Sequence, residues 1–204
     1  MTAISKPRIR AIEITYVGMF AALMAIGANI TSMVPFLQVA GVPLTMQTFF
    51  AVLAGLLLGS RLGAISMTVY MLIGIAGAPV FSGFEAGLAP LIGGTGGFIL
   101  SFIATAYFAG KIVEHAKGSP TLKTFMIAAF VGLFMNYFIG TNYMYFAFNF
   151  WLEVKMSYGA AWSVMAWFIV KDLAFTIFAA LISPRIFRAV TRNSVNPSST
   201  NLSK

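Results

Sequence analysis

The feature that most constrains this chain is a succession of long apolar segments separated by short connections. A helix needs about 20 mainly apolar residues to cross the ~30 Å hydrocarbon core of a bilayer. Six segments approach this length, at residues 13–33, 44–60, 62–79, 92–113, 122–147 and 160–183. The sequence therefore predicts an all-α integral membrane protein with six transmembrane helices, of which the second is the shortest.

Basic side chains are concentrated at the two ends of the chain and in the second and fourth connections. They are Lys6, Arg8, Arg10, Arg61, Lys111, Lys117, Lys123, Arg185, Arg188, Arg192 and Lys204. Of the thirteen basic residues, only Lys155 and Lys171 lie elsewhere. Because cytoplasmic loops carry the excess of Lys and Arg, this pattern predicts that both termini are cytoplasmic. Five helices would put the two basic ends on opposite sides, so six is the better count.

Composition agrees with a membrane domain. Hydrophobic residues make up 59% of the chain, charged residues 9%, and the mean hydropathy is +0.89. We divide the chain into a basic cytoplasmic segment (1–12), a six-helix membrane domain (13–185) and a cytoplasmic tail (186–204). The tail is rich in Ser and Asn and is expected to be disordered. The net charge of +8 suits anionic lipid headgroups, so we expect the lipid bilayer as a partner and no nucleic acid.

Several kinds of chemistry are missing from the sequence. There is no cysteine, and His115 is the single histidine. A metal site built on two histidines and a Cys metal site are therefore excluded, and no histidine lies in an apolar segment to activate a serine nucleophile. The G-x-x-x-x-G-K-[ST] phosphate loop is also absent. We expect no enzymatic activity, no catalytic residue, no metal and no cofactor.

Two adjacent charges, Lys171 and Asp172, lie inside the sixth apolar segment. Each charge within a membrane costs roughly 2.5–3.5 kcal/mol on insertion scales. Neighbouring residues point about 100° apart on a helix, so we expect that they do not simply neutralise each other. A ligand or the fifth segment must supply a partner, from Asn136, Tyr137, Thr141, Asn142 and Tyr143. Both charges are candidate ligand-site residues, although the long stem of Lys171 could instead reach toward the interface.

The outer connections are apolar and contain Pro and Gly. The first covers about residues 31–43, and the third, residues 79–92, includes Phe81 and Phe84. Such loops either fold over a ligand or pack on helix ends, and a loop over a ligand would become ordered on binding. The glycine run 93–97 opens the fourth segment and could let a ligand approach a helix amino terminus, or it could serve helix packing.

The first apolar segment carries small residues at spacings of three and four. They are Gly18, Ala21, Ala22, Ala25 and Ala28. Small residues let two helices approach closely in a membrane. This flank either packs inside the protein or docks a partner membrane protein.

Five short motifs occur in order along the chain, at residues 42–48 (Val-Pro-Leu-Thr-Met-Gln-Thr), 53–63, 74–81, 93–98 and 137–140, and Asp172 follows them. Together they resemble the BioY family, the biotin-binding substrate-specific (S) components of energy-coupling-factor (ECF) transporters, in which Asp172 matches an acidic position of the sixth helix. The resemblance covers about residues 16–185. Two positions depart from the family pattern, because Lys171 stands where the family usually has Gly and Phe175 where it has Lys. The third outer loop is also poorer in glycine than is usual.

The resemblance implies a subunit in a prokaryotic cell membrane that captures biotin from outside. Its implied partners are a transmembrane coupling protein and two cytoplasmic ATPases. The predicted substrate-binding residues are Thr45, Gln47, Phe81, Ser82, Phe84, Glu85, Thr95, Asn136, Tyr137, Tyr143, Lys171 and Asp172. The predicted partner-docking residues are Gly18, Ala21, Ala22 and Ala25. The alternatives are an S component for another small vitamin, a stand-alone secondary transporter with Asp172 as an ion relay, and a structural scaffold.

Overall fold

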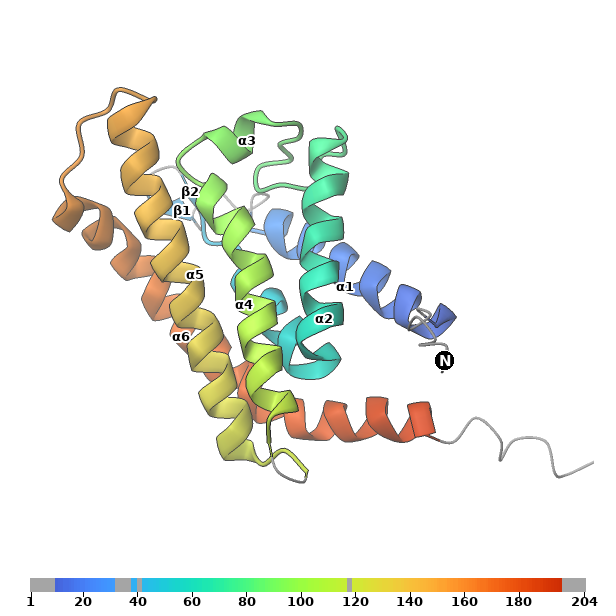
Figure 1. Ribbon diagram of the computed structural model, residues 1–204. Coiled ribbons are helices and arrows are strands. Elements are labelled where there is room, and N and C mark those ends of the chain that lie inside the picture. The colour runs from blue at the N-terminus through green and yellow to red at the C-terminus, as the bar shows by residue number, and fades with distance from the viewer. Residues whose placement is uncertain (1–9, 32–37, 40–41, 117–118, 196–204) are drawn as a thin grey trace, which may run out of the picture.

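The computed structural model describes residues 10–31, 38–39, 42–116 and 119–195 of the chain. Over these residues the chain forms helices and one pair of very short strands (Figure 1). In chain order the elements are α1 (Ala11–Asn29), β1 (Gln38–Val39), β2 (Val42–Pro43), α2 (Gln47–Ile75), α3 (Ala89–Ile92), α4 (Gly96–Glu114), α5 (Leu122–Phe150) and α6 (Tyr158–Val195). The strands pair antiparallel, with Gln38 opposite Pro43 and Val39 opposite Val42.

Five of the described helices, α1, α2, α4, α5 and α6, are long and apolar enough to cross a membrane. The chain is therefore a multi-pass α-helical membrane protein. The sequence predicts six such helices. The difference arises because most of the predicted segment 44–60 and most of the segment 62–79 belong to one helix, α2.

α2 is folded back on itself at Gly59, which has the non-helical angles φ 80° and ψ 179°. The Gln47 amide donates to the Tyr70 hydroxyl at 2.9 Å although the two residues are 23 positions apart. In a straight helix they would be separated by about 35 Å, at ~1.5 Å per residue. Gly63 also packs against the backbone of Ala54. α2 is thus a hairpin with a first arm (47–58) and a second arm (60–75), and Figure 1 shows its turn at the lower end.

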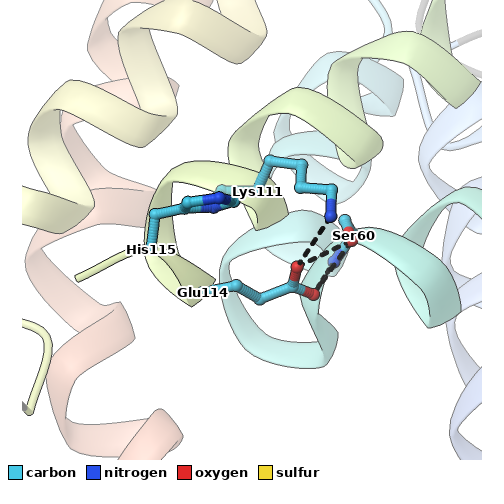
Figure 2. Close-up of polar contacts among 4 residues, drawn as sticks. All are labelled: Ser60, Lys111, Glu114 and His115. Atoms are coloured by element: carbon cyan, nitrogen blue, oxygen red, sulfur yellow. Dashed lines mark hydrogen bonds and ion pairs between the residues drawn. The ribbon is translucent and has the colours of Figure 1, made fainter. Parts of the chain in front are cut away.

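The turn of α2 is held by the end of α4. The Glu114 carboxylate accepts a hydrogen bond from the Ser60 backbone N–H at 2.6 Å and from its hydroxyl at 2.8–2.9 Å (Figure 2). A carboxylate is favourable there because the first N–H groups of a helix lack partners inside it. Lys111 lies 3.8 Å from the same carboxylate, and its carbonyl contacts the His115 ring at 2.7 Å.

Small residues allow the helices to approach closely. A side chain at Gly55 would meet the backbone of Ala106, and one at Gly110 would meet the backbone of Ser60. Gly132 in α5 likewise faces Thr105 in α4. Between helices in a membrane, where no hydrophobic force draws them together, such close approach supplies the dispersion contacts that hold the bundle.

α6 bends near Pro184, where the ring removes a backbone donor from the helix. Figure 1 shows the last part of α6 running across the lower end of the bundle. There the Phe187 ring packs edge-on against Phe125 with centroids 5.6 Å apart. The helix continues through residues 186–195, so the prediction of a disordered tail from residue 186 is wrong for these residues. Residues 1–9 and 196–204 of the predicted terminal segments lie outside the described residues.

The two ends of the bundle differ in structure. α3, β1, β2 and the connection between α5 and α6 lie at one end, which we call the α3 end. The turn of α2, the end of α4 and the last part of α6 lie at the opposite end (Figure 1). The predicted first outer connection, including Pro35 and Gly41, falls largely outside the described residues.

Candidate ligand-binding site

A cavity of about 470 Å³ lies among α2, α4, α5, α6 and the segment that connects α2 to α4. Its polar lining comes from Thr45, Gln47, Thr48, Ser82, Glu85, Thr95, Asn136, Tyr137, Lys171 and Asp172. The rest of the wall is mainly aromatic and aliphatic, including Phe81, Phe98, Phe102, Phe148 and Phe168. An apolar wall with a few placed polar groups is the usual composition of a site for a small organic molecule.

The strongest electrostatic feature of the cavity is a buried ion pair from α6. Lys171 Nζ lies 2.8 Å from Asp172 Oδ1, and Asp172 is only 3% exposed. Lys171 also donates to the backbone oxygen of Thr45. The expectation that these neighbouring charges do not simply neutralise each other is therefore wrong. The helix directs their Cα–Cβ bonds apart, but the flexible lysine stem brings Nζ back to the carboxylate.

The second partner of the carboxylate comes from α5. The Tyr137 hydroxyl donates to Asp172 Oδ2 at 2.7 Å, and Tyr137 is one of the fifth-segment partners that the sequence proposes. Among the described residues, Oδ1 has no hydrogen-bond partner beyond its ion pair with Lys171. A carboxylate has about four lone-pair positions. Asp172 can therefore accept further donors from a ligand.

A neutral polar cluster forms another part of the wall. Asn136 is 1% exposed; its side-chain oxygen accepts from the Ser101 hydroxyl at 2.7 Å, and its amide donates to the Thr48 hydroxyl at 3.3 Å. These contacts join α5 to α4 and to the first arm of α2. A buried and satisfied network of this kind fixes the orientation of its members.

One wall of the cavity, the α2–α3 wall, is formed by the segment between α2 and α3, which contains Phe81 and Ser82. Phe81 is 1% exposed and occupies the space beside Gly74, where a larger residue would collide with its ring. Ser82 Oγ is buried without a hydrogen-bond partner among the described residues. An unpaired buried hydroxyl is costly, so Ser82 is available to a polar ligand group.

The segment that forms the α2–α3 wall is anchored to the helices. Asn29 Oδ1 accepts from the Phe84 backbone N–H at 2.7 Å, and Gly87 N–H donates to the Gly74 oxygen at 2.8 Å. Phe84 itself adopts φ 60°. These contacts require no ligand, so we now expect a preformed wall here rather than a loop that becomes ordered on binding.

Ten of the twelve predicted substrate-binding residues line the cavity, and two do not. Phe84 is 53% exposed and is not part of the lining. The Tyr143 hydroxyl donates to the Leu91 oxygen at 2.6 Å, and its ring packs edge-on with Trp151, so Tyr143 supports the α3 segment instead. The glycine run contributes Gly94 to the lining, together with Thr95.

Sequence reasoning missed much of the apolar wall. Val164, Met165 and Phe168 line the cavity from α6, and Met144 and Phe148 line it from α5. Phe168 and Met165 precede Asp172 by four and seven positions, and Met144 follows Tyr137 by seven. Helical spacing from those two polar residues could have found them. Nothing else distinguishes these side chains from the lipid-facing ones.

The predicted docking flank of α1 is divided between two environments. Gly18 and Ala22 are exposed, and a side chain at Gly18 would meet nothing within 4 Å. Ala25 is half-buried, whereas Ala21 is only 4% exposed and belongs to the core. The exposed small-residue face is therefore Gly18 and Ala22, and Ala21 serves internal packing.

The fold and the cavity define a class of protein, a multi-pass α-helical membrane protein with a cavity of the composition that suits a small organic molecule. The BioY family profile matches residues 2–192. BioYB of Bacillus subtilis (strain 168) is 52% identical over 183 residues, which cover 90% of this chain and 91% of that protein. The biotin transporter BioY of Thermotoga maritima is 31% identical over 170 residues, covering 83% and 92%.

A solved structure shares the fold. It is the crystal structure of the S-component for biotin from an ECF-type ABC transporter, with a TM-score of 0.73. The match covers 92% of this chain and 95% of that one at 22% identity. The chain belongs to the BioY family, which confirms the resemblance inferred from its motifs.

Proposed function

We propose that this chain is the biotin-binding S component of an ECF transporter in a prokaryotic cell membrane. It captures biotin from outside and delivers it through a coupling module. Family membership supports the substrate, because the Thermotoga maritima relative is named a biotin transporter. The observation that carries the proposal is the cavity, which combines an apolar wall with the buried Lys171–Asp172 pair.

The chemistry of biotin suits this combination. Its ureido ring carries two N–H donors and one carbonyl acceptor, and its thiophane ring and valeryl chain are apolar. Asp172 accepts the N–H donors, Lys171 donates to the carbonyl oxygen or the carboxylate, and the Phe and Met side chains bury the remainder. Contacts to charged groups in a site without water are about twice as strong as neutral ones, so the α6 pair anchors the ligand.

The proposed orientation puts the cavity toward the outside. Arg61, Lys111 and Arg185 belong to the end of the bundle opposite α3, at the turn of α2, the end of α4 and the bend of α6. A basic end faces the cytoplasm by the positive-inside rule. With each arm of α2 counted as a crossing, six crossings put both termini on that side.

Energy must come from partner subunits, because the chain has no phosphate loop. We propose that a transmembrane coupling protein docks on the exposed face at Gly18 and Ala22 and links the chain to two cytoplasmic ATPases. Small residues on that face let a partner helix approach closely. A stand-alone secondary transporter is less well supported, because the ion-relay candidate Asp172 is already engaged by Lys171 and Tyr137.

Equilibrium binding of radiolabelled biotin to the purified chain tests the proposal. We expect saturable binding that unlabelled biotin displaces and that riboflavin and thiamine do not. Displacement by riboflavin or thiamine would point to another vitamin. Uptake by proteoliposomes that contain this chain alone would instead support a secondary transporter.

A further inference from the structure

Tyr70, in the second arm of α2, does not line the cavity but contacts residues that do. It is 1% exposed, and its hydroxyl lies 2.9 Å from the Gln47 amide nitrogen and 3.0 Å from the Val80 backbone oxygen. Its ring packs edge-on against Phe81 with centroids 5.6 Å apart. One buried side chain thus joins the two arms of α2 to the α2–α3 wall.

Hydrogen-bond accounting fixes the direction of both bonds. The Val80 carbonyl can only accept, and it also accepts from Asn29 Nδ2 at 3.3 Å. The single proton of the Tyr70 hydroxyl is therefore donated to Val80. The hydroxyl oxygen must then accept from Gln47, which has to present its NH₂ group rather than its carbonyl oxygen.

We propose that Tyr70 is a positioning residue that sets the orientation of the Gln47 amide and thereby the specificity of the cavity. With its NH₂ group held by Tyr70, Gln47 offers its carbonyl oxygen to the cavity that it lines. The wall thus gains an acceptor besides Asp172. At neutral pH the N–H donors of biotin lie only on its ureido ring, so this acceptor selects for that ring.

This inference rests on the proposed function and deepens it. Without the Tyr70 hydroxyl, the Gln47 amide is free to turn over and present a donor to the ligand N–H. A site that hydrogen-bonds a ligand donor rejects an analogue without it, because a buried polar group is then left unpaired. Tyr70 therefore controls how strongly the cavity prefers a ligand with a ureido N–H donor over one without it.

The test compares biotin with biotin methylated at one ureido nitrogen, bound to the purified chain. Tyr70→Phe keeps the ring against Phe81 and removes only the hydroxyl. We expect the ratio of the two affinities to fall by about tenfold, the loss expected for one oriented hydrogen bond in a dry site. In a chain that already carries Gln47→Met, Tyr70→Phe should not change the ratio further, because Tyr70 acts through the Gln47 amide.

Tyr143→Phe is the matched control. It also removes a hydroxyl that donates to a backbone carbonyl, that of Leu91, but contacts no amide of the cavity. The ratio should be unchanged in this variant. If Tyr70→Phe does not fold, Gln47→Met alone must lower the ratio.

An equal loss of affinity for both ligands in Tyr70→Phe would overturn the inference, since it would indicate a purely structural residue. A fall in the ratio that persists in Gln47→Met would overturn it as well. These results are separate from failure of the proposed function, in which the unmodified chain would not bind biotin at all.

Discussion

At the scale of single residues, the Lys171–Asp172 pair concentrates the chemistry of this chain. Asp172 is buried and Lys171 is half-buried, and Tyr137 and Thr45 complete their hydrogen bonding. Removing one partner of such a pair leaves an uncompensated charge, which is more costly than the pair itself is favourable.

Asp172→Asn should weaken biotin binding by at least tenfold, about 1.4 kcal/mol. The amide replaces a charged acceptor with a neutral one and leaves Lys171 without its counter-ion, while Asn can still accept from Tyr137. Equilibrium binding to the purified variant measures the effect. Glu153→Gln makes the same chemical change outside the cavity and should bind normally. If the two variants bind biotin with equal affinity, Asp172 is not part of the binding site.

The positions of both charges could be predicted from sequence, because charges are rare in apolar segments. Their direct contact could not, since it depends on the conformation of a flexible lysine stem. Most of the apolar side chains that line the cavity could not be predicted either. Phe168 faces the cavity and Trp167, its neighbour, is 69% exposed, yet both are large aromatic residues in the same apolar run.

At the scale of elements, α2 shows how one glycine determines the architecture. Gly59 has φ 80° and ψ 179°, a region essentially restricted to glycine. A Cβ there would lie 2.6 Å from Glu114 Oε1, the atom that caps the second arm. The sequence predicts a connection at Arg61, between the apolar segments 44–60 and 62–79. It could not predict the antiparallel packing of the arms, which depends on contacts such as Gly63 with Ala54.

Gly59→Ala should lower the stability of the purified chain by about 1–3 kcal/mol, because alanine is strained at these backbone angles. Thermal unfolding in detergent measures the loss. Gly18→Ala is the control, because it lies in a helix with open space around it, and alanine there should be neutral or slightly stabilising. Equal stability of the two variants would argue against a strained turn.

A second prediction at this scale concerns the exposed face of α1. Ala22→Leu should preserve biotin binding by the isolated chain and impair uptake by the assembled transporter, because bulk on this face holds a partner helix away. Ala21→Leu should instead destabilise the chain itself, since Ala21 is 4% exposed. Binding assays, uptake assays and thermal unfolding separate the two effects. Normal uptake by Ala22→Leu would exclude this face as the docking surface.

At the scale of the whole molecule, polarity is distributed along the bundle axis. The segment between α2 and α4, which contains α3, lines the cavity at one end of the bundle. Arg61, Lys111 and Arg185 belong to the other end. The basic residues alone predict which end of the bundle faces the cytoplasm. The cavity could not be predicted from the sequence, because its lining side chains come from α2, α4, α5 and α6, which are distant in the chain.

Site-directed labelling tests the central claim, that biotin binds in this cavity from outside. The chain has no cysteine, so one introduced thiol gives an unambiguous signal. Glu85 is exposed and lines the cavity, while Lys155 is exposed and does not. In intact cells, a membrane-impermeant maleimide should modify Glu85→Cys, and biotin should slow this reaction while leaving Lys155→Cys unaffected. A rate for Glu85→Cys that biotin does not change, or modification only after the cells are opened, would contradict the account.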